Sequence, residues 1–462
     1  MKTRPLLITL YLIAGLGTLP SCRPHQGEEE GNRPNIIFIL ADDLGWHQLG
    51  CYRSDYYLTP VLDRMASEGM RFTNAYAAAP VCSPTRGSIM TGKYPARTHL
   101  TVNIPTGRDL DRPTITPEFA EWLPLDETTI AEVLKTAGYT TGHFGKWHLN
   151  KDKDYAPGRP RDPGSQGFDV VLTTHKYRAG PPSPYEEDWQ HVRQITEHTL
   201  DFIEANKDGP FFAYVSHNSI HRPEMEKESL ISEYKARPGS DNDVEYGHNN
   251  PTQAAMLEVL DASVGRILDR VKELAIDENT IIVFFSDNGQ LGPKDSTPLR
   301  GSKADLYEGG IRSPMIVRWP GQVPAGTTSD EPVISNDFFP TFAALAEVED
   351  LPTDIDGLDL SNLVRDPSAG LERAALFFHF PHYHSQGLGP QGAIREGNYK
   401  LIEYYENNLL GEDGAFELFN LESDLAERHN LADEQPERVE AMSEKLRAWR
   451  KSVGAQEMTL PE

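Results

Sequence analysis

The sequence predicts an α/β fold with a mainly parallel central sheet, followed by a smaller C-terminal α+β domain with an antiparallel sheet. Apolar runs at 35–41, 211–215 and 280–285 have the length and composition of strands buried on both faces, as in a parallel sheet. Helical patterns stand between them, so strands and helices alternate over residues 34–345. From about residue 346, short strand candidates follow one another, which is typical of an antiparallel sheet.

The first 22 residues are predicted to be a lipoprotein signal peptide. Their apolar run, residues 6–19, is too short to span a bilayer. It ends in a sequence that looks like a bacterial lipobox with Cys22 as the lipidated residue, although Pro20 departs from the usual pattern and plain secretion is the alternative. Residues 23–33 are polar and are expected to form a flexible tether. We therefore expect an exported protein, in the periplasm or at the outer membrane or cell surface, that meets a membrane only through a lipid anchor.

The composition fits a globular protein of two or three domains. The chain has 462 residues, of which 38% are hydrophobic and 25% charged. Its formal net charge of −26 argues against a nucleic-acid partner, although a few cations in one pocket could still bind an anionic substrate. The three cysteines, Cys22, Cys51 and Cys82, are too few for a disulfide framework. If Cys22 carries lipid, only a Cys51–Cys82 bridge is possible.

The remaining elements follow from the same periodicities. In the large domain, helices are expected at 59–69, 130–137 and 253–275, with a further short strand at 139–144. The strands lead into polar segments, and the carboxyl ends of strands are where open α/β sheets bind ligands. In the C-terminal domain, the expected short strands and terminal helix lie at 376–380, 392–395, 400–405, 416–421 and 434–453.

The segment Cys82-Ser83-Pro84-Thr85-Arg86 is predicted to open a short helix, with Ser83 as its N-cap and Pro84 in its first turn. Cys82 would then lie at the positive end of the helix dipole, and Arg86 would lie one turn along on the same side. That arrangement suits a bound anion. A buried free cysteine beside a structural arginine is the alternative interpretation.

Two strand ends each present a pair of polar oxygens. Asp42 and Asp43 follow the first strand, and Asp287 and Asn288 follow the strand at 280–285. Because parallel strands bring their ends to one rim of the sheet, we expect these four side chains to lie together. Three carboxylates and one amide oxygen suit a hard divalent cation, either Ca²⁺ or Mg²⁺. Taken alone, each pair is also typical of a solvated turn.

Two lysines and two histidines complete the candidate site. Lys146 and His148 lie two residues apart after a strand, so in an extended chain they would point to the same side. His221 lies on a strand-exit loop, and Lys303 precedes a Glu-Gly-Gly turn at 308–310. Taken alone, each lysine is also compatible with a solvated surface position and each histidine with a structural role.

Taken together, five segments resemble the formylglycine-dependent sulfatase family in order and spacing. The resemblance runs from Pro34 to about Leu431, and the chain looks closest to the bacterial polysaccharide sulfatases of the arylsulfatase-like type I group. It implies an alkaline-phosphatase-like catalytic domain at 34–345 and a C-terminal α+β subdomain at 346–462. The segments are Asp42-Asp43-Leu44-Gly45, Cys82-Ser83-Pro84-Thr85-Arg86, Gly145-Lys146-Trp147-His148, Ser286-Asp287-Asn288-Gly289, and Lys303 before Glu308-Gly309-Gly310.

The resemblance also implies a modified nucleophile and a metal ion. Cys82 would be oxidised to formylglycine by a sulfatase-maturing enzyme, and the aldehyde hydrate would supply both the nucleophile and a metal ligand. The other ligands of one Ca²⁺ would be Asp42, Asp43, Asp287 and Asn288.

The remaining implied roles concern binding and proton transfer. Arg86 would hold the hydrate, Lys146 and Lys303 would bind sulfate oxygens, His148 would be the base that releases sulfate, and His221 would assist the leaving group. If the nucleophile were a serine, the reaction would stop at a stable sulfate ester of that serine. A hydrate has a second hydroxyl, and its deprotonation by His148 expels sulfate. The fixed cations would stabilise the negative charge that spreads over the sulfuryl oxygens during transfer.

The expected function is hydrolysis of sulfate esters on a sulfated carbohydrate, with galactose or N-acetylgalactosamine 4-sulfate favoured by the resemblance. One alternative is a phosphoester or phosphonate hydrolase of the same superfamily. Another is a non-catalytic glycan-binding lipoprotein in which Cys82 stays a thiol. Loop residues from both domains are expected to recognise the sugar, and the candidates are His175, Arg222, His382, His384 and Arg395.

Overall fold

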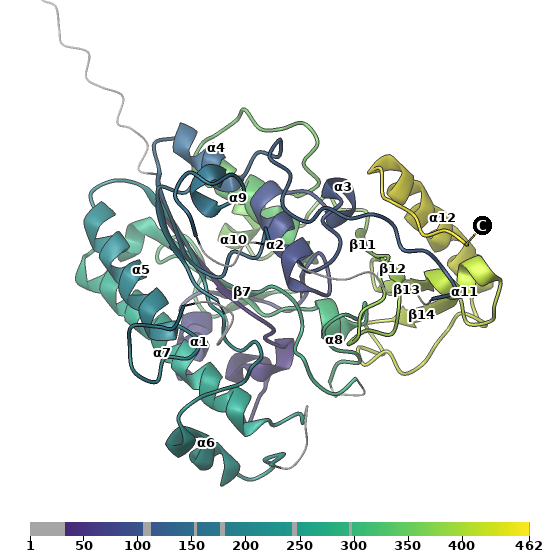
Figure 1. The fold of residues 1–462 in the computed structure, drawn as a ribbon, viewed down its shortest axis with the longest axis horizontal. Coiled ribbons are helices and arrows are strands. Elements are labelled where there is room, and N and C mark those ends of the chain that lie inside the picture. Colours follow the sequence, from purple (N-terminus) through teal and green to yellow (C-terminus); the bar gives the residue numbers. More distant parts are fainter. Residues whose placement is uncertain are drawn as a thin grey trace, which may run out of the picture. The chain divides into compact units, whose positions relative to one another are not determined.

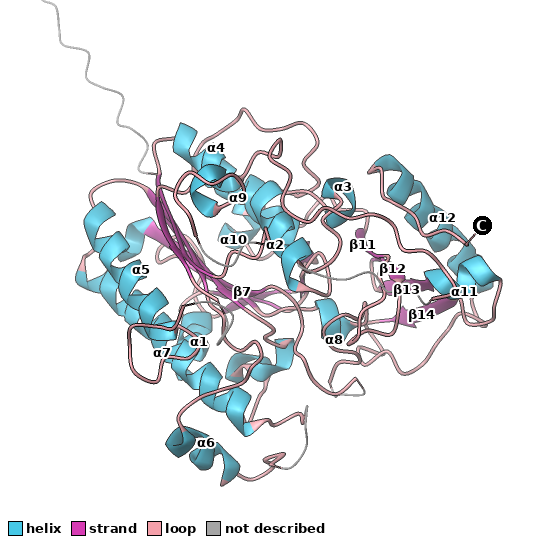
Figure 2. Cartoon of the chain, viewed as in Figure 1, coloured by secondary structure: helices cyan, strands magenta, loops and turns pink. Residues whose placement is uncertain are grey.

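The structure is a computed structural model that describes residues 33–104, 112–151, 155–175, 181–242, 247–294 and 298–461. The predicted signal peptide, Cys22 and all of the tether except Arg33 lie outside the described residues. Arg33–Glu462 form one compact unit, which Figure 1 shows with some of its elements labelled and Figure 2 shows coloured by type of element. Within the described ranges, we find no helix with the length and apolar character needed to cross a membrane.

In this part of the chain, an eight-stranded sheet carries the strand order β5-β4-β6-β1-β7-β8-β2-β9. Strand β8 pairs antiparallel with β7 and β2, and the other pairings in the sheet are parallel, which confirms the predicted mainly parallel sheet. The strands are β1 (Asn35–Ala41), β2 (Met70–Phe72), β4 (Thr140–Gly145), β5 (Val170–Thr173), β6 (Phe211–Ser216), β7 (Thr280–Ser286), β8 (Met315–Arg318) and β9 (Thr327–Ser329).

Helices cover both faces of this sheet, which explains why its central strands are apolar throughout. In β1, Phe38 packs into one hydrophobic cluster, while its neighbours Ile37 and Ile39 pack into the cluster on the opposite face. The first cluster includes residues of α2 (Cys82–Thr91), α4 (Ile130–Thr136), α9 (Phe338–Leu345) and α10 (Ser361–Arg365). The second includes residues of α1 (Pro60–Ser67), α5 (Val192–Asn206), α6 (Glu228–Lys235) and α7 (Pro251–Glu273).

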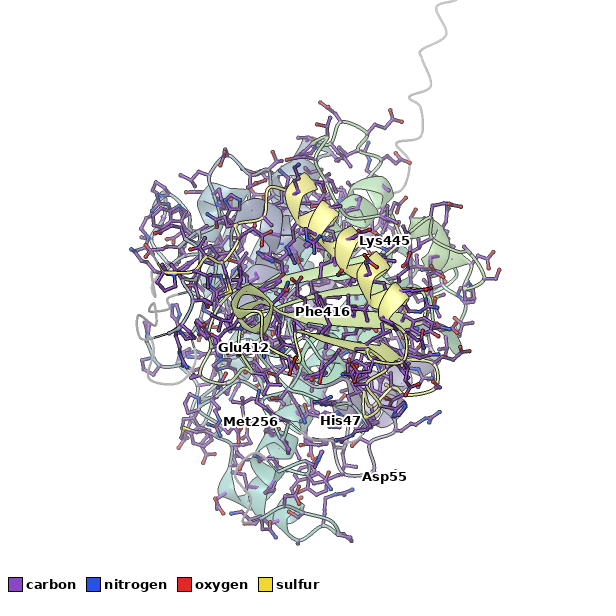
Figure 3. All side chains as sticks on the ribbon, turned by 90° about the vertical axis from the view of Figure 1, so that its right-hand side faces the viewer. His47, Asp55, Met256, Glu412, Phe416 and Lys445 are labelled. Carbon is purple, nitrogen blue, oxygen red and sulfur yellow. The ribbon has the colours of Figure 1, made fainter. Side chains whose placement is uncertain are left out.

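The C-terminal part contains an antiparallel sheet of order β11-β12-β13-β14, as predicted. Figure 3 shows α12 (Pro436–Ser452), which carries Lys445, lying across this sheet. Leu360 and Leu363, however, pack in the core of the large sheet, and the division at 345/346 stays a prediction. The four strands are β11 (Leu376–Phe380), β12 (Gln391–Glu396), β13 (Tyr399–Tyr404) and β14 (Phe416–Asn420).

Smaller elements connect these layers. Strands β3 (Ala75–Tyr76) and β10 (Val333–Ile334) form a short parallel pair. The short helices are α3 (Pro95–Thr98), α8 (Glu308–Ile311) and α11 (Tyr405–Leu410), with 3-10 turns at Trp46–Gln48, Gly50–Tyr52, Pro163–Gln166, Asp277–Asn279 and Ser335–Asp337.

Candidate active site

A cavity of about 620 Å³ lies at the carboxyl ends of the neighbouring strands β4, β6, β1 and β7. The predicted catalytic residues therefore meet at one rim of the sheet, as expected for an open α/β fold. Arg86, Asp287 and Asn288 are buried beside this cavity and do not line it. The predicted site residues on its wall are Asp42, Asp43, Cys82, Lys146, His148, His221 and Lys303.

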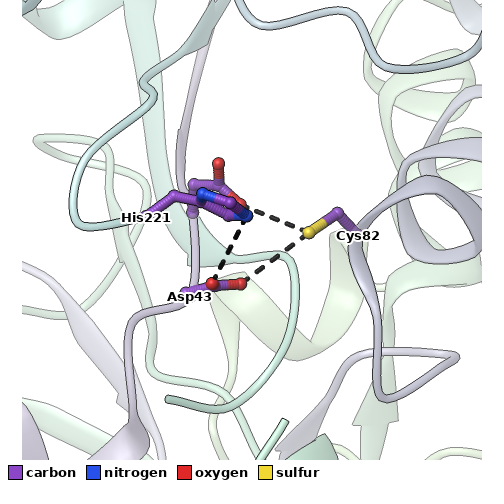
Figure 4. A group of neighbouring side chains, drawn as sticks. Asp43, Cys82 and His221 are labelled. Carbon is purple, nitrogen blue, oxygen red and sulfur yellow. Dashed lines mark hydrogen bonds and ion pairs between the residues drawn. The ribbon is translucent and has the colours of Figure 1, made fainter. Parts of the chain in front are cut away.

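Cys82 is the first residue of helix α2, and its thiol faces the strand ends. Its Sγ lies 3.4 Å from Asp42 Oδ1 and 3.3 Å from Lys303 Nζ. Burial and the neighbouring Asp287 carboxylate raise the pKa of the Cys82 thiol above its usual 9.0, against the opposing effect of nearby lysines. Figure 4 shows Asp43, Cys82 and His221 turned toward one another.

The start of helix α2 differs from the prediction. The N-cap is Val81, in an extended conformation, and not Ser83. The Ser83 hydroxyl instead accepts a hydrogen bond from the backbone N–H of Ile104, 3.1 Å away, and so anchors a neighbouring loop. The predicted position of Cys82 at the helix N-terminus is nevertheless confirmed. Cys51 and Cys82 are both free thiols, so the possible bridge between them is absent from the described residues.

The carboxylates at this rim are each matched with a cation. Lys146 Nζ lies 2.7 Å from Asp42 Oδ2, and Lys303 Nζ lies 2.6 Å and 2.9 Å from the two oxygens of Asp43. Burial alone would raise the pKa of Asp43. The positive charges of Lys303 and of other side chains near Asp43 outweigh burial and hold that pKa well below 3.8.

Arg86 performs the same role for the deepest carboxylate. It donates from Nε to Asp287 Oδ2 at 2.8 Å and pairs with the same oxygen through Nη2 at 2.7 Å. Burial and the nearby Asp42 carboxylate nevertheless raise the pKa of Asp287, although Arg86 and Lys146 oppose them. Arg86 also donates to the backbone carbonyl of Lys146 at 2.9 Å, so it joins the ends of β4 and β7.

The donor set at the strand ends fits a hard divalent cation. Potential ligand atoms of Asp42, Asp43, Cys82 and His221 all lie within 4.8 Å of one another. The amide of Asn288 adds a buried oxygen, Oδ1, which has no hydrogen-bond partner among the described residues. Carboxylate and amide oxygens are the ligands that Ca²⁺ and Mg²⁺ prefer. His221 was not predicted as a ligand, whereas Asp287 was, and the exact ligand set stays a prediction.

The surroundings of His148 favour the neutral form of its ring. Because a carbonyl oxygen can only accept, the contact of His148 Nε2 with the Ile104 carbonyl places the ring proton on Nε2. Its Nδ1 is buried and has no hydrogen-bond partner among the described residues. Burial, together with the positive charges of Lys146 and Arg86, holds the pKa of His148 well below 6.5. The ring is therefore uncharged at neutral pH and carries a lone pair on Nδ1.

Lys146 and His148 were predicted to point to the same side because the chain between them would be extended. The backbone at His148 is not extended, so this reason is wrong. His148 has φ of 58°, in the left-handed region. Both side chains still line the cavity.

The segments that carry Lys303 and Asn288 are locked together by backbone contacts. Lys303 N–H donates to the Gln290 carbonyl at 2.8 Å, and Gly289 N–H donates to the Gly310 carbonyl at 2.9 Å. A Cβ atom at Gly289 would lie 1.8 Å from the Gly309 carbonyl oxygen, so only glycine permits this approach. The glycines of both motifs thereby place the lysine beside the strand ends.

The five predicted sugar-recognition residues divide into two groups. His175, Arg222 and His384 line the cavity. His382 and Arg395 do not: both are buried, His382 bonded to the Thr101 hydroxyl at 2.7 Å and Arg395 to the Tyr76 hydroxyl. Their surroundings indicate structural roles. Wall residues that the sequence interpretation missed come from loops without a recognisable motif, among them Asn103, Ile104, Tyr155, Ser385 and Gln386.

Comparison with solved structures supports the class of protein that this fold and site define. The chain superimposes with a TM-score of 0.75 on the crystal structure of Ps i-CgsB in complex with k-i-k-neocarrahexaose, at 27% identity over 90% of this chain and 93% of that one. The phosphonate monoester hydrolase of Agrobacterium radiobacter, at 18% identity and a TM-score of 0.68, covers 91% of this chain and 96% of its own and shares the fold. The fold is thus alkaline-phosphatase-like.

Sequence comparison gives the family. The family model described as Sulfatase matches residues 34–348, and the model of the N-sulphoglucosamine sulphohydrolase C-terminal region matches residues 302–452. A sulfatase of Formosa agariphila is 30% identical over 95% of this chain and 92% of its own length, and human arylsulfatase A is 29% identical over 95% and 90%. The chain belongs to the sulfatase family of formylglycine-dependent, type I sulfuric ester hydrolases.

Proposed function

We propose that this protein hydrolyses sulfate esters on a sulfated carbohydrate, with a formylglycine formed from Cys82 as its nucleophile and one Ca²⁺ as its metal ion. The observation that carries the proposal is the position of Cys82. Its Sγ lies 3.3 Å from Lys303 Nζ and 3.4 Å from Asp42 Oδ1 on the wall of a cavity, within a domain that matches the sulfatase family. A partner is implied, the enzyme that oxidises Cys82.

The proposed roles of the side chains follow from their charges and protonation. Lys146 and Lys303 line the cavity and bind the sulfate oxygens, while Arg86 approaches the modified residue from the buried side. His148 takes a proton at Nδ1, the ring nitrogen without a partner among the described residues. His221, from the exit loop of β6, gives a proton to the departing sugar oxygen.

The proposed calcium site consists of Asp42, Asp43, Asp287, Asn288 and the modified residue 82. The buried Asn288 Oδ1 without a described partner supports this set, because a cation would supply the missing contact. When bound, Ca²⁺ would supply positive charge to the sulfate oxygens. Mg²⁺ is the alternative metal ion, and an assay in which one ion is exchanged for the other distinguishes it from Ca²⁺.

The proposed sugar is galactose or N-acetylgalactosamine sulfated at O4. A relative from Sus scrofa named N-acetylgalactosamine-6-sulfatase is 34% identical over 78% of this chain and 69% of its own length. Its name supports the sugar but not the position, so O6 is the competing outcome. We also propose that the protein is exported and anchored through a lipid on Cys22, with its catalytic domain at 34–345.

The test is a desulfation panel with protein produced together with a sulfatase-maturing enzyme. The panel contains galactose and N-acetylgalactosamine sulfated at O4 or O6, glucosamine 6-sulfate, and the matching phosphate monoesters. We expect sulfate release with a preference for the galactose-type 4-sulfates. Dominant phosphatase or phosphonate hydrolase activity would overturn the proposal. An unmodified Cys82 in the peptide Val81–Arg86 of protein from its native host would favour a non-catalytic glycan-binding protein.

A further inference from the structure

We propose that His384 recognises the sugar, by donating a hydrogen bond from its Nε2 to a hydroxyl oxygen of the residue that carries the sulfate. This inference rests on the proposed function, because it assigns a role on the carbohydrate side of the same cavity. His384 lies in the connection between β11 and β12, so the C-terminal sheet would contribute directly to substrate selection.

The protonation of His384 is set within its own loop. The backbone N–H of Gln386 donates to His384 Nδ1 at 3.2 Å. A backbone N–H can only donate, so Nδ1 must be the acceptor, and in the neutral ring the proton is on Nε2. Among the described residues, Nε2 makes no hydrogen bond of its own. The ring therefore offers one N–H donor at the cavity wall.

The charges around the ring favour the neutral form. Burial, with Lys303 and Lys294 nearby, lowers the pKa of His384 to about 4. At neutral pH His384 is thus a neutral donor and not a further cation. A neutral N–H suits an uncharged oxygen such as a sugar hydroxyl, whereas the sulfate already has the cations Lys146 and Lys303 on the cavity wall.

The loop that carries His384 is fixed to the segment that carries Lys303. The buried side chain of Asp305 accepts from Leu388 N–H at 2.9 Å through Oδ1 and from Ser302 N–H at 3.2 Å through Oδ2. Lys294 Nζ pairs with the same Oδ2 at 2.6 Å. Asp305 thereby joins the loop of His384 to the loop of Lys303.

A second contact draws the two backbones together. A Cβ atom at Gly387 would lie 2.6 Å from the Ala304 carbonyl oxygen, closer than a Cβ atom can approach a backbone oxygen. The ring of His384 is therefore placed at a defined distance from Lys303, which a specificity-determining residue requires.

The test compares a sulfated sugar with an aryl sulfate that has no sugar hydroxyls. The kcat/KM is measured for the best sugar of the panel and for 4-nitrophenyl sulfate, with wild type, His384→Ala and His384→Gln. Loss of one hydrogen bond worth about 0.5–1.5 kcal/mol corresponds to a fold-change of about 2 to 13. We expect the sugar-to-aryl ratio of kcat/KM to fall by this factor in His384→Ala, and to recover in part in His384→Gln, which keeps an N–H donor.

Two further variants separate recognition from a general loss of structure. His429 is an exposed histidine of the C-terminal part that does not line the cavity, and His429→Ala should keep the wild-type ratio. Gly387→Ala displaces the loop without removing the ring, and it should lower the ratio as His384→Ala does. An unchanged ratio in His384→Ala would overturn the inference while the proposed function stands. A wild type that releases sulfate from neither substrate would overturn both.

Discussion

Replacement of Lys400 by methionine should destabilise the protein, because Lys400 neutralises two buried carboxylates. Lys400 Nζ lies 2.9 Å from Glu308 Oε1 and 2.9 Å from Glu427 Oε1, and all three residues are fully buried. In Lys400→Met, Glu308 keeps its pair with Arg312 at 2.9 Å. Among the residues that the structure describes, the Glu427 carboxylate then keeps only the backbone N–H of Glu308, at 2.7 Å, as a hydrogen-bond partner.

The magnitude follows from the uncompensated charge of Glu427. Removing one partner of a buried ion pair costs about 3–5 kcal/mol. An unfolding entropy of about 2 cal/mol/K per residue gives roughly 1 kcal/mol/K for a chain of this length, so Tm should fall by about 3–5 °C.

The loss should depend on pH. Burial raises the pKa of Glu427 from 4.5 to about 7, with Lys400 opposing the rise and Glu308 adding to it. A carboxyl with a raised pKa binds its proton more tightly in the folded state. The stability it contributes is therefore present at low pH and is lost as the pH rises from about 4.5 to about 7. Without Lys400 this pKa rises further, so Lys400→Met should cost less at pH 5 than at pH 8.

The assay is thermal unfolding of wild type, Lys400→Met and the double variant Lys400→Met/Glu427→Gln at both pH values. The double variant removes the unpaired charge and should recover part of the lost Tm at pH 8. A Lys400→Met variant with wild-type Tm at pH 8, or with the same loss at pH 5 and pH 8, would refute the reasoning.

Three further predictions concern the active site. Removal of Ca²⁺ with EGTA should abolish sulfate release and lower Tm by about 3 °C, since an ion at 100 times its Kd stabilises by about 2.7 kcal/mol; full recovery with Mg²⁺ alone would contradict the calcium assignment. His148→Gln should lower kcat by about 10²–10⁴-fold and should lower KM as well, because slower release of sulfate lets the sulfated intermediate accumulate; an unchanged kcat would exclude His148 as the base. Burial, Lys146 and Arg86 hold the pKa of His148 well below 6.5, so protonation of His148 should not lower kcat near pH 6.5. A fall of kcat below pH 6.5 that is seen in the wild type and is lost in His148→Gln would contradict this prediction.

Much of the fold could be predicted because the central strands carry a strong local signal. The apolar run of β1 is buried on both faces, and the polar residues that follow it and β7 mark the rim of the sheet. Helices α5 and α6 were not predicted. In α5 the buried residues Ile195, Thr199 and Ile203 do recur at helical spacing, but threonine weakened the apolar pattern. The short strand β8 is too brief to be recognised without its neighbours.

The site could be predicted as a set of residues but not as an arrangement. The helix that carries Cys82 was predicted, but its N-cap is Val81 and not Ser83, and the role of Ser83 depends on Ile104, which is distant in sequence. Likewise, nothing local distinguishes His384, which lines the cavity, from His382, which is buried against Thr101. Contacts between distant segments decide these roles, and they become visible only in the folded chain.

Sulfate release by the wild type and by Cys82→Ala tests the proposed nucleophile most directly. Both proteins are produced with a sulfatase-maturing enzyme and assayed on the best sugar of the panel, with thermal unfolding as a control for folding. We expect turnover by the wild type and none above background by Cys82→Ala, while the variant keeps its fold and its calcium binding. Substantial sulfate release by Cys82→Ala would contradict the mechanism.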